Sequence, residues 1–87
     1  MKIKYHKKFE KQFKKLSLKD KNRVIEVVEI FINNPHDKRL LNHSLKGRLL
    51  GKKAISLSSD LRIIFEEFDN YTLVIFLDLG THNRVYG

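Results

Sequence analysis

The 87-residue sequence contains no cysteine, so it can form neither a disulfide framework nor a thiolate-ligated zinc site. This absence fits a reducing compartment, and we expect the protein to be cytoplasmic. No apolar stretch is long enough to span a bilayer, and none follows the basic N-terminus as a signal peptide requires. The sequence also has no repeat, low-complexity stretch or interdomain linker, so we expect a single domain over residues 1–87.

Acidic residues are few as well. The sequence holds 10 Asp and Glu residues against 18 Lys and Arg residues, for a net charge of +8 at neutral pH. A small, strongly cationic domain suits a polyanionic partner, with nucleic acid as the first candidate and an acidic protein as the second. Lysine-rich surfaces also occur for solubility alone, so the charge leaves that explanation open. The four histidines are too scattered to predict a metal site, and we expect no metal or other cofactor.

The first third of the chain predicts a short strand followed by two amphipathic helices. Residues 1–5 alternate apolar and cationic side chains, as a strand does. Apolar residues then recur at helical spacing, with lysines on the other side: Phe9, Phe13 and Leu16. Ser17 is a good N-cap for a second helix, which Asn33-Asn34-Pro35 stops. Because the two helices are short and adjacent, we expect a helical hairpin that packs on a sheet.

The second half of the chain predicts strands. Three β-like runs cover residues 53–57, 61–68 and 72–79. Their short links favour antiparallel neighbours. The expected fold is therefore α+β in the order β-α-α-β-β-β: an N-terminal strand, a helical hairpin and an antiparallel β-meander, with the helices packed on one sheet face.

Strict alternation along these strands assigns each residue to one sheet face. It turns three residues of the last strand toward the helices: Leu73, Ile75 and Leu77. It places three others on the opposite face: Val74, Phe76 and Asp78. That second face also carries Ser56 and Arg62, and its mixture of polar groups predicts a functional site. In the alternative interpretation it is a solvated face, on which Arg62 pairs with Asp78 or Glu66.

Side chains that can move protons or bind phosphate follow the last strand. His82, Arg84 and Tyr86 come soon after the apolar run 73–77. Reactive groups are often placed where a strand leaves its sheet, because the scaffold behind them is rigid. In the alternative interpretation His82 and Tyr86 only cap and cover a sheet edge.

Four segments in this order and spacing resemble the RelE/ParE toxin superfamily of bacterial toxin–antitoxin systems, and within it the RelE/YafQ branch. They are His-Ser-Leu-Lys-Gly at 43–47, Gly-Lys-Lys at 51–53, Asp-Leu-Arg-Ile-Ile-Phe at 60–65 and Gly-Thr-His-Asn-Arg-Val-Tyr at 80–86. The resemblance covers the whole chain in architecture and is motif-specific from His43 onward. No single segment is diagnostic, and the joint occurrence carries the resemblance.

The resemblance implies a metal-independent endoribonuclease that cuts mRNA in the ribosomal A site. In this reaction the 2′-hydroxyl attacks the adjacent phosphate and leaves a 2′,3′-cyclic phosphate, which requires a base, phosphate-binding cations and an acid. By position, the resemblance implies these catalytic residues: His43, Asp60, Arg62, His82 and Tyr86. Tyr86 would either stack on a base or donate a proton. We further expect RNA contacts from Lys46, Lys52, Lys53, Ser56 and Arg84. Ser56 stands where YafQ-like toxins have a second histidine, which shifts more of the work to His43 and His82.

The implied partners are a cognate antitoxin, the ribosome and mRNA, and no membrane. Two other functions remain open. The chain could be a ParE-like toxin that inhibits DNA gyrase without nuclease activity. It could also be a small basic RNA-binding module, for which Phe76 would be the exposed aromatic on the polar face.

Overall fold

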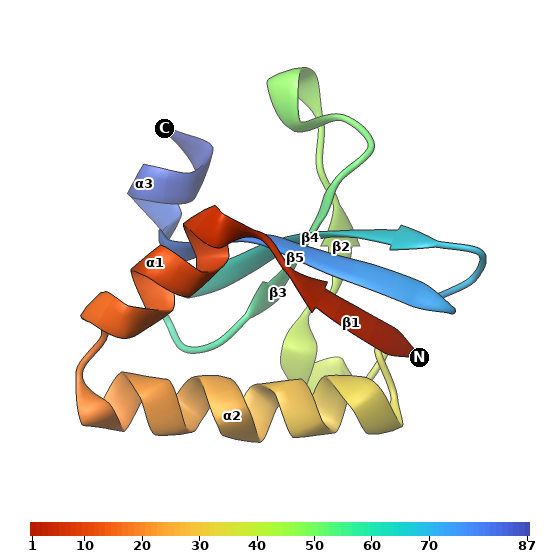
Figure 1. Cartoon of the computed structure of the whole chain (residues 1–87). Helices are drawn as coiled ribbons and strands as arrows, with labels where there is room; N and C mark the ends of the chain where they lie inside the picture. The colour runs from red at the N-terminus through yellow and green to blue at the C-terminus, as the bar shows by residue number, and fades with distance from the viewer.

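The computed structural model describes residues 1–87 and shows a five-stranded sheet with helices on both faces (Figure 1). The elements follow in the order β1 (Lys2–Tyr5), α1 (Lys7–Lys15), α2 (Leu18–Asn33), η1 (Lys38–Leu40), β2 (His43–Ser44), η2 (Gly47–Leu49), β3 (Lys53–Ser56), β4 (Leu61–Phe68), β5 (Leu73–Thr81) and α3 (His82–Tyr86). The prediction of an α+β fold with an N-terminal strand, a helical hairpin and a meander is confirmed. The short strand β2 and the C-terminal helix α3 are additional.

Each of the two long helices has a side-chain N-cap. His6 precedes α1, and its Nδ1 accepts a hydrogen bond from the backbone N–H of Lys8 at 3.0 Å. Ser17 caps α2 as predicted, because its Oγ accepts from the backbone N–H of Asp20 at 3.2 Å. The helix α2 ends at Asn33, the first residue of the predicted Asn33-Asn34-Pro35 stop. None of the helices has the length and apolar character needed to cross a membrane.

The strands lie in the order β1-β5-β4-β3-β2. β3, β4 and β5 form the predicted antiparallel meander, and β2 adds an antiparallel edge to β3. β1 runs parallel to β5 at the other edge. The helices α1 and α2 connect β1 to the rest of the chain and cover one face of the sheet, here called the α2 face (Figure 1).

The main hydrophobic core lies on the α2 face. Phe31 of α2 meets Phe65 of β4 edge-on with ring centroids 5.2 Å apart, and Phe76 of β5 with centroids 5.6 Å apart. Such aromatic pairs add to the apolar area that they remove from water. The cluster joins both long helices to the three central strands, and its 12 buried residues are Phe9, Val24, Val27, Phe31, Leu40, Ile55, Leu57, Ile63, Phe65, Val74, Phe76 and Leu79.

A β-bulge corrects the predicted faces of β5. Ile64 pairs with Asp78 and Phe65 pairs with Phe76, so Leu77 is an extra residue in the ladder. Before the bulge, Val74 and Phe76 face the helices and are fully buried. The prediction that residues 73, 75 and 77 face the helices is therefore wrong, because one inserted residue reverses the alternation. Phe76 is not an exposed aromatic, which removes the feature cited for a sheet-face RNA-binding module.

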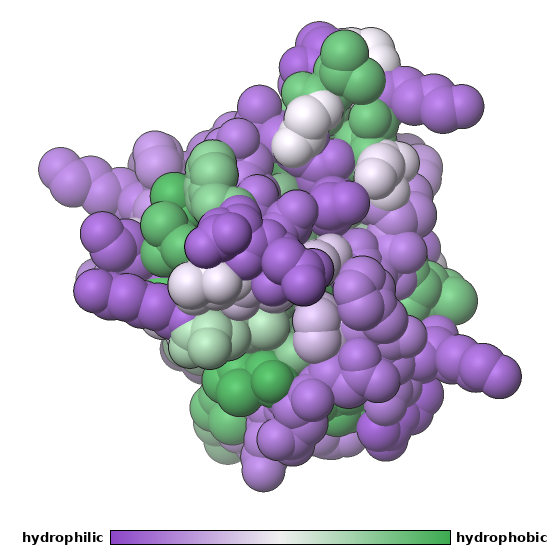
Figure 2. Space-filling model, turned by 90° about the vertical axis from the view of Figure 1, so that its right-hand side faces the viewer, coloured by the Kyte–Doolittle hydropathy of each residue, from purple (hydrophilic) through white to green (hydrophobic).

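The other sheet face, here called the α3 face, carries a much smaller apolar cluster. Ala54, Ile64 and Val85 are buried together, with Leu45, Leu77 and Tyr86 packed against them. Val85 and Tyr86 come from α3, which lies on the side of the sheet opposite α2 (Figure 1). The η2 loop (residues 45–52) projects on the same side. It forms the protrusion at the top of Figure 2, where Leu50 is 75% exposed.

Candidate active site

Cross-strand register gathers the candidate residues on the α3 face. Ser56 lies opposite Arg62, which lies opposite Gly80. His43 lies opposite Ala54, a member of the cluster under α3. Directly paired residues share a face, and so do alternate residues of one strand. His43, Ser56 and Arg62 therefore project from the same side of the sheet.

The start of α3 is tied to the turn between β3 and β4. The backbone N–H of His82 donates to the backbone oxygen of Asp60 at 2.8 Å. Thr81 caps the helix, since its Oγ1 accepts from the backbone N–H of Arg84 at 3.3 Å. Asp60 itself is exposed in this turn. These bonds fix the helix start, so that His82 stands beside the Asp60 turn.

A surface hollow of about 340 Å³ brings three of the predicted catalytic residues together. This active-site hollow is lined by His43, Leu45, Lys46, Arg48, Leu49, His82 and Tyr86. His43 Nδ1 lies 2.8 Å from the backbone oxygen of Leu41. A carbonyl oxygen can only accept, so Nδ1 carries the proton in this bond, and in the neutral form of the ring Nε2 has a free lone pair. Such an imidazole is suited to accept a proton.

Tyr86 contributes a protonated phenol to the active-site hollow. Its ring lies 4.4 Å from the His82 ring, at an interplanar angle of 75°. Its hydroxyl is buried and has no hydrogen-bond partner within the chain. Burial raises the pKa of Tyr86 above its usual value, while the positive charge of Arg62 acts in the opposite direction. The hydroxyl is therefore a proton donor, and not a base, at neutral pH.

Arg62 keeps a positive charge that no carboxylate neutralises. Its guanidinium donates to the backbone oxygens of Ser58 at 2.8 Å, Leu61 at 3.0 Å and Ser59 at 3.3 Å. The alternative pairing of Arg62 with Asp78 or Glu66 is wrong, because none of the ion pairs in the structure includes Arg62. Ser56 Oγ donates to the same oxygen of Ser58 at 2.9 Å. Neutral carbonyls can be exchanged for a phosphate, which a guanidinium binds more strongly.

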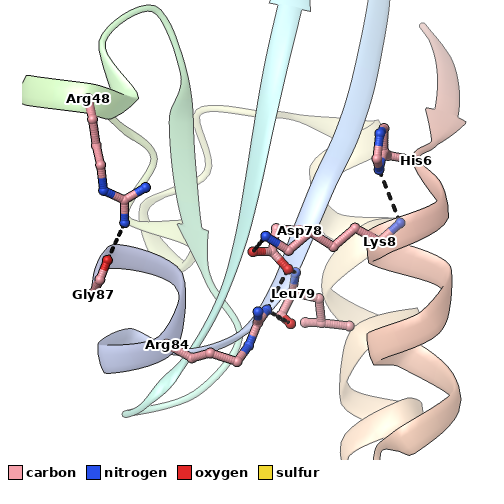
Figure 3. Close-up of polar contacts among 7 residues, drawn as sticks. All are labelled: His6, Lys8, Arg48, Asp78, Leu79, Arg84 and Gly87. Carbon is pink, nitrogen blue, oxygen red and sulfur yellow. Dashed lines mark hydrogen bonds and ion pairs between the residues drawn. The ribbon is translucent and has the colours of Figure 1, made fainter.

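Arg84 points away from the active-site hollow. Its guanidinium forms an ion pair with Asp78 and donates to the backbone oxygen of Leu79 at 2.5 Å (Figure 3). Asp78, the only buried charged residue, also accepts from the backbone N–H of Leu79 and lies 3.4 Å from Lys8 Nζ. A Cβ on Gly80 would meet the Arg84 guanidinium, so a larger residue there would make this side chain shift. Arg84 thus anchors α3 to the sheet.

The predicted lysines separate into three positions. Lys46 lines the active-site hollow, and Lys52 lines a second cavity next to it. Lys53 pairs with Phe65 and so lies on the α2 face, where its Nζ donates to Ser44 Oγ at 3.2 Å. Six predicted site residues therefore do not line the active-site hollow: Lys52, Lys53, Ser56, Asp60, Arg62 and Arg84. The structure also adds Arg48, which sequence reasoning missed although it lies between the quoted segments 43–47 and 51–53. No group of three or more His, Cys, Asp or Glu side chains in the structure could hold a metal ion.

Comparisons with known proteins agree with this architecture. A family model described as "Bacterial toxin of type II toxin-antitoxin system, YafQ" matches residues 1–87. The crystal structure of YafQ from E. coli strain BL21(DE3) is 27% identical, with a TM-score of 0.80, over 98% of this chain and 97% of that chain. YafQ in the E. coli DinJ-YafQ complex is 24% identical, with a TM-score of 0.74, over 98% and 97% of the two chains.

An archaeal relative has the same fold. The RelE-RelB complex from Pyrococcus horikoshii OT3 contains a chain that is 22% identical, with a TM-score of 0.75, over 95% of this chain and 96% of that one. A search of curated proteins gave no match. The likeness thus extends along essentially the whole chain in each of these structures.

Proposed function

The chain belongs to the YafQ family of bacterial toxins of type II toxin–antitoxin systems, and from this membership we propose that it is a metal-independent endoribonuclease that cleaves mRNA in the ribosomal A site. One observation carries the proposal. His43, His82 and Tyr86 line one hollow, and Arg62 projects from the same sheet face with a charge that no carboxylate neutralises. Cleavage of RNA by its own 2′-hydroxyl requires groups that accept and donate protons and a cation that binds the phosphate. Two imidazoles, a phenol and a guanidinium can supply these functions.

The reaction proceeds by in-line attack within the RNA chain. His43 Nε2 accepts the proton of the 2′-hydroxyl as the bond between the 2′-oxygen and phosphorus forms. Arg62 binds the phosphate oxygens, on which negative charge accumulates. The bond from phosphorus to the 5′-oxygen then breaks, and that oxygen receives a proton from the pair of His82 and Tyr86. The Tyr86 phenol can donate at neutral pH, because its pKa lies above the usual value of 10.0.

Dependence on the ribosome follows from the same residues. β3 carries Ser56 where YafQ-like toxins have a histidine, and a serine hydroxyl is a poor base at neutral pH. The 2′-hydroxyl of a flexible RNA must therefore be aligned by other means. Holding reacting groups in line can supply roughly 7 to 11 kcal/mol of barrier reduction, and the A site holds the message in place for that purpose. The proposal places the protein in the cytoplasm, where ribosomes are.

A cognate antitoxin is the second proposed partner. Two of the similar structures are complexes, DinJ-YafQ and RelE-RelB. The surplus of basic residues here, with a net charge of +8, suits an acidic antitoxin segment. We expect such a segment to compete with RNA for the basic α3 face.

Primer extension on a translated message tests the nuclease directly. Wild-type protein should cut the message in the presence of ribosomes and leave the same message largely intact without them. His82→Ala should abolish cleavage, because it removes one of the two imidazoles. The matched control is His36→Ala, since His36 is an exposed histidine outside the active-site hollow. Undiminished cutting by His82→Ala would show that the site is misassigned. Intact messages together with blocked DNA supercoiling would favour the gyrase-inhibiting alternative.

A further inference from the structure

A second cavity, of about 420 Å³, lies on the α3 face between the start of α1, the η2 loop and α3. Here it is called the Asp78 cavity, and its charged lining consists of Lys8, Arg48, Lys52, Asp78 and Arg84. Figure 3 shows Lys8 and Arg84 on either side of Asp78, and Arg48 above the end of α3. Ile64, Leu77 and Val85 supply apolar walls. The charged and apolar side chains therefore surround a concave site and do not form a flat basic surface.

Positive charge exceeds negative charge in the Asp78 cavity. Four cationic side chains line the cavity with a single acidic side chain, and that residue, Asp78, already pairs with both Arg84 and Lys8. Arg48 donates to the oxygen of Gly87, the last residue of the sequence, at 2.5 Å. None of the ion pairs in the structure includes Lys52. Lys52 is thus left without an ionic partner beside apolar walls, where an anion interacts more strongly than in open water.

The Asp78 cavity adjoins the active-site hollow. Arg48 and Leu49 of the η2 loop line both, so the two concavities share one wall. An extended polyanion held in the active-site hollow can therefore reach the Asp78 cavity past Arg48. Arginine suits this position, because its planar fork can bond two oxygens of one phosphate.

We propose that the Asp78 cavity binds a second phosphate of RNA, through Arg48 and Lys52, while the scissile phosphate lies in the active-site hollow. The proposal rests on the proposed function and adds a subsite to it. The ligand is a phosphodiester group, and it can come from the message or from ribosomal RNA. Asp78 directs the ligand toward Arg48 and Lys52, because its negative charge already occupies Arg84 and Lys8.

Two neighbouring lysines give a matched test. Lys52 lines the Asp78 cavity, whereas Lys53 lies on the α2 face and bonds to Ser44. Lys52→Ala and Lys53→Ala remove the same charge one residue apart. Binding is measured with a short single-stranded RNA that carries a 2′-deoxynucleotide at the cleavage position, so that no nucleophile is present. Lys52→Ala should weaken binding roughly tenfold at low salt. It should also reduce the slope of log K against log salt by about 0.7, the value for one phosphate contact on a single strand.

The control variant Lys53→Ala should bind nearly as the wild type does. Equal losses for the two variants would overturn the proposal, because the basic charge would then act diffusely. The proposal would also be overturned if Lys52→Ala left both the affinity and the salt slope unchanged, for the oligonucleotide and for vacant ribosomes alike. Thermal melting of each variant checks the fold, and Lys52→Gln provides a second substitution that retains most of the length of the side chain.

Binding to vacant ribosomes separates the two sources of phosphate. Without message, the affinity of the same variants for ribosomes reports on ribosomal RNA. Loss confined to the oligonucleotide assigns the phosphate to the message, and loss confined to vacant ribosomes assigns it to ribosomal RNA. Neither measurement requires cleavage. A protein that cuts no message but loses affinity through Lys52→Ala would therefore refute the nuclease while supporting the phosphate subsite.

Discussion

The two faces of the sheet differ in what they bury. The α2 face buries a cluster of 12 apolar residues contributed by two long helices and by the strands. The α3 face buries three, under a helix of five residues, and carries the only buried charged side chain. Every candidate side chain of the active-site hollow lies on this second side.

This difference separates stability from chemistry. Apolar burial on the α2 face supplies most of the free energy of folding, because that energy is roughly proportional to the apolar area removed from water. The α3 face is then free to hold groups that would destabilise a core, such as unneutralised cations and a phenol without a partner. Substitutions on the two faces should accordingly produce different kinds of defect.

The largest expected effect on stability comes from truncating the α2 face. Phe65→Ala should lower the free energy of unfolding by about 3 to 5 kcal/mol, because Phe65 is fully buried and contacts the rings of Phe31 and Phe76. Leu77→Ala on the α3 face should cost less than half as much, since Leu77 is only partly buried. Urea unfolding with the slope held constant gives both values. Equal costs would erase the distinction between the faces.

Arg62→Ala should produce the opposite kind of defect. Loss of a phosphate-binding guanidinium should raise the barrier to cleavage by roughly 2 to 4 kcal/mol, while the free energy of unfolding falls by only about 1 kcal/mol. Single-turnover cleavage on ribosomes and urea unfolding measure the two quantities. Arg39→Ala is the control, because Arg39 is exposed and pairs with Asp37 away from the active-site hollow. A variant that unfolds as easily as Phe65→Ala would place Arg62 among the stabilising residues.

Asp78→Asn should give an intermediate effect on both quantities. Arg84 and Lys8 would lose their shared carboxylate, at a cost of about 1 to 2 kcal/mol, because their side chains are 36% and 56% exposed and solvent screens the pair. Amide hydrogen exchange in α3 should accelerate more than exchange in α2. In a double-mutant cycle with Arg84→Gln, the combined loss should be smaller than the sum of the single losses. Strict additivity would mean that the two residues do not act together.

The smallest effect is expected from Tyr86→Phe. The buried hydroxyl has no partner within the chain, so its removal should leave stability unchanged or raise it by up to about 1 kcal/mol. Thermal melting at neutral pH measures this change. A clear loss of stability would mean that the hydroxyl makes a bond in solution.

The raised pKa of Tyr86 predicts that Tyr86→Phe also changes how stability depends on pH at high pH. Burial raises this pKa above its usual value of 10.0, so above pH 10 the folded state retains a proton that the unfolded state has lost. Stability should therefore be unaffected by this group below pH 10 and should fall as the pH rises above it. Tyr86→Phe should remove this part of the decline. An identical decline in the two proteins would show that Tyr86 titrates alike in both states.

Local sequence patterns predicted the elements well but could not predict the register of β5. Helical spacing and the Ser17 cap depend on neighbouring residues, and so does the alternation of residues 61–68. Residues 73–77 are all apolar, so alternation says nothing about which of them face the core. The bulge at Leu77 depends on pairing with β4, which lies outside any local window.

The candidate site was predictable only in part, for a similar reason. The motif segments indicated His43, His82 and Tyr86, which the fold brings into one hollow. They could not indicate the direction of Arg84, because its ion pair with Asp78 depends on how α3 packs against β5. They also gave no reason to separate Lys52 from Lys53, of which one lines the Asp78 cavity and the other lies on the α2 face.

The bulge at Leu77 also makes β5 unevenly tolerant of changes in length. Phe76 faces the core and Asp78 faces the reactive surface, although they are two residues apart, because Leu77 is the extra residue between them. Deleting Leu77 would leave Phe76 and Asp78 on their present faces, because the residues of β5 would then alternate between the two faces without interruption. Deleting Ile75 would instead put Val74 and Phe76 next to each other, and one of these two core residues would turn outward unless the bulge moved. Single-codon deletions along this strand should therefore be least harmful at the bulge, which makes position 77 the place where a shorter version of the strand can be engineered.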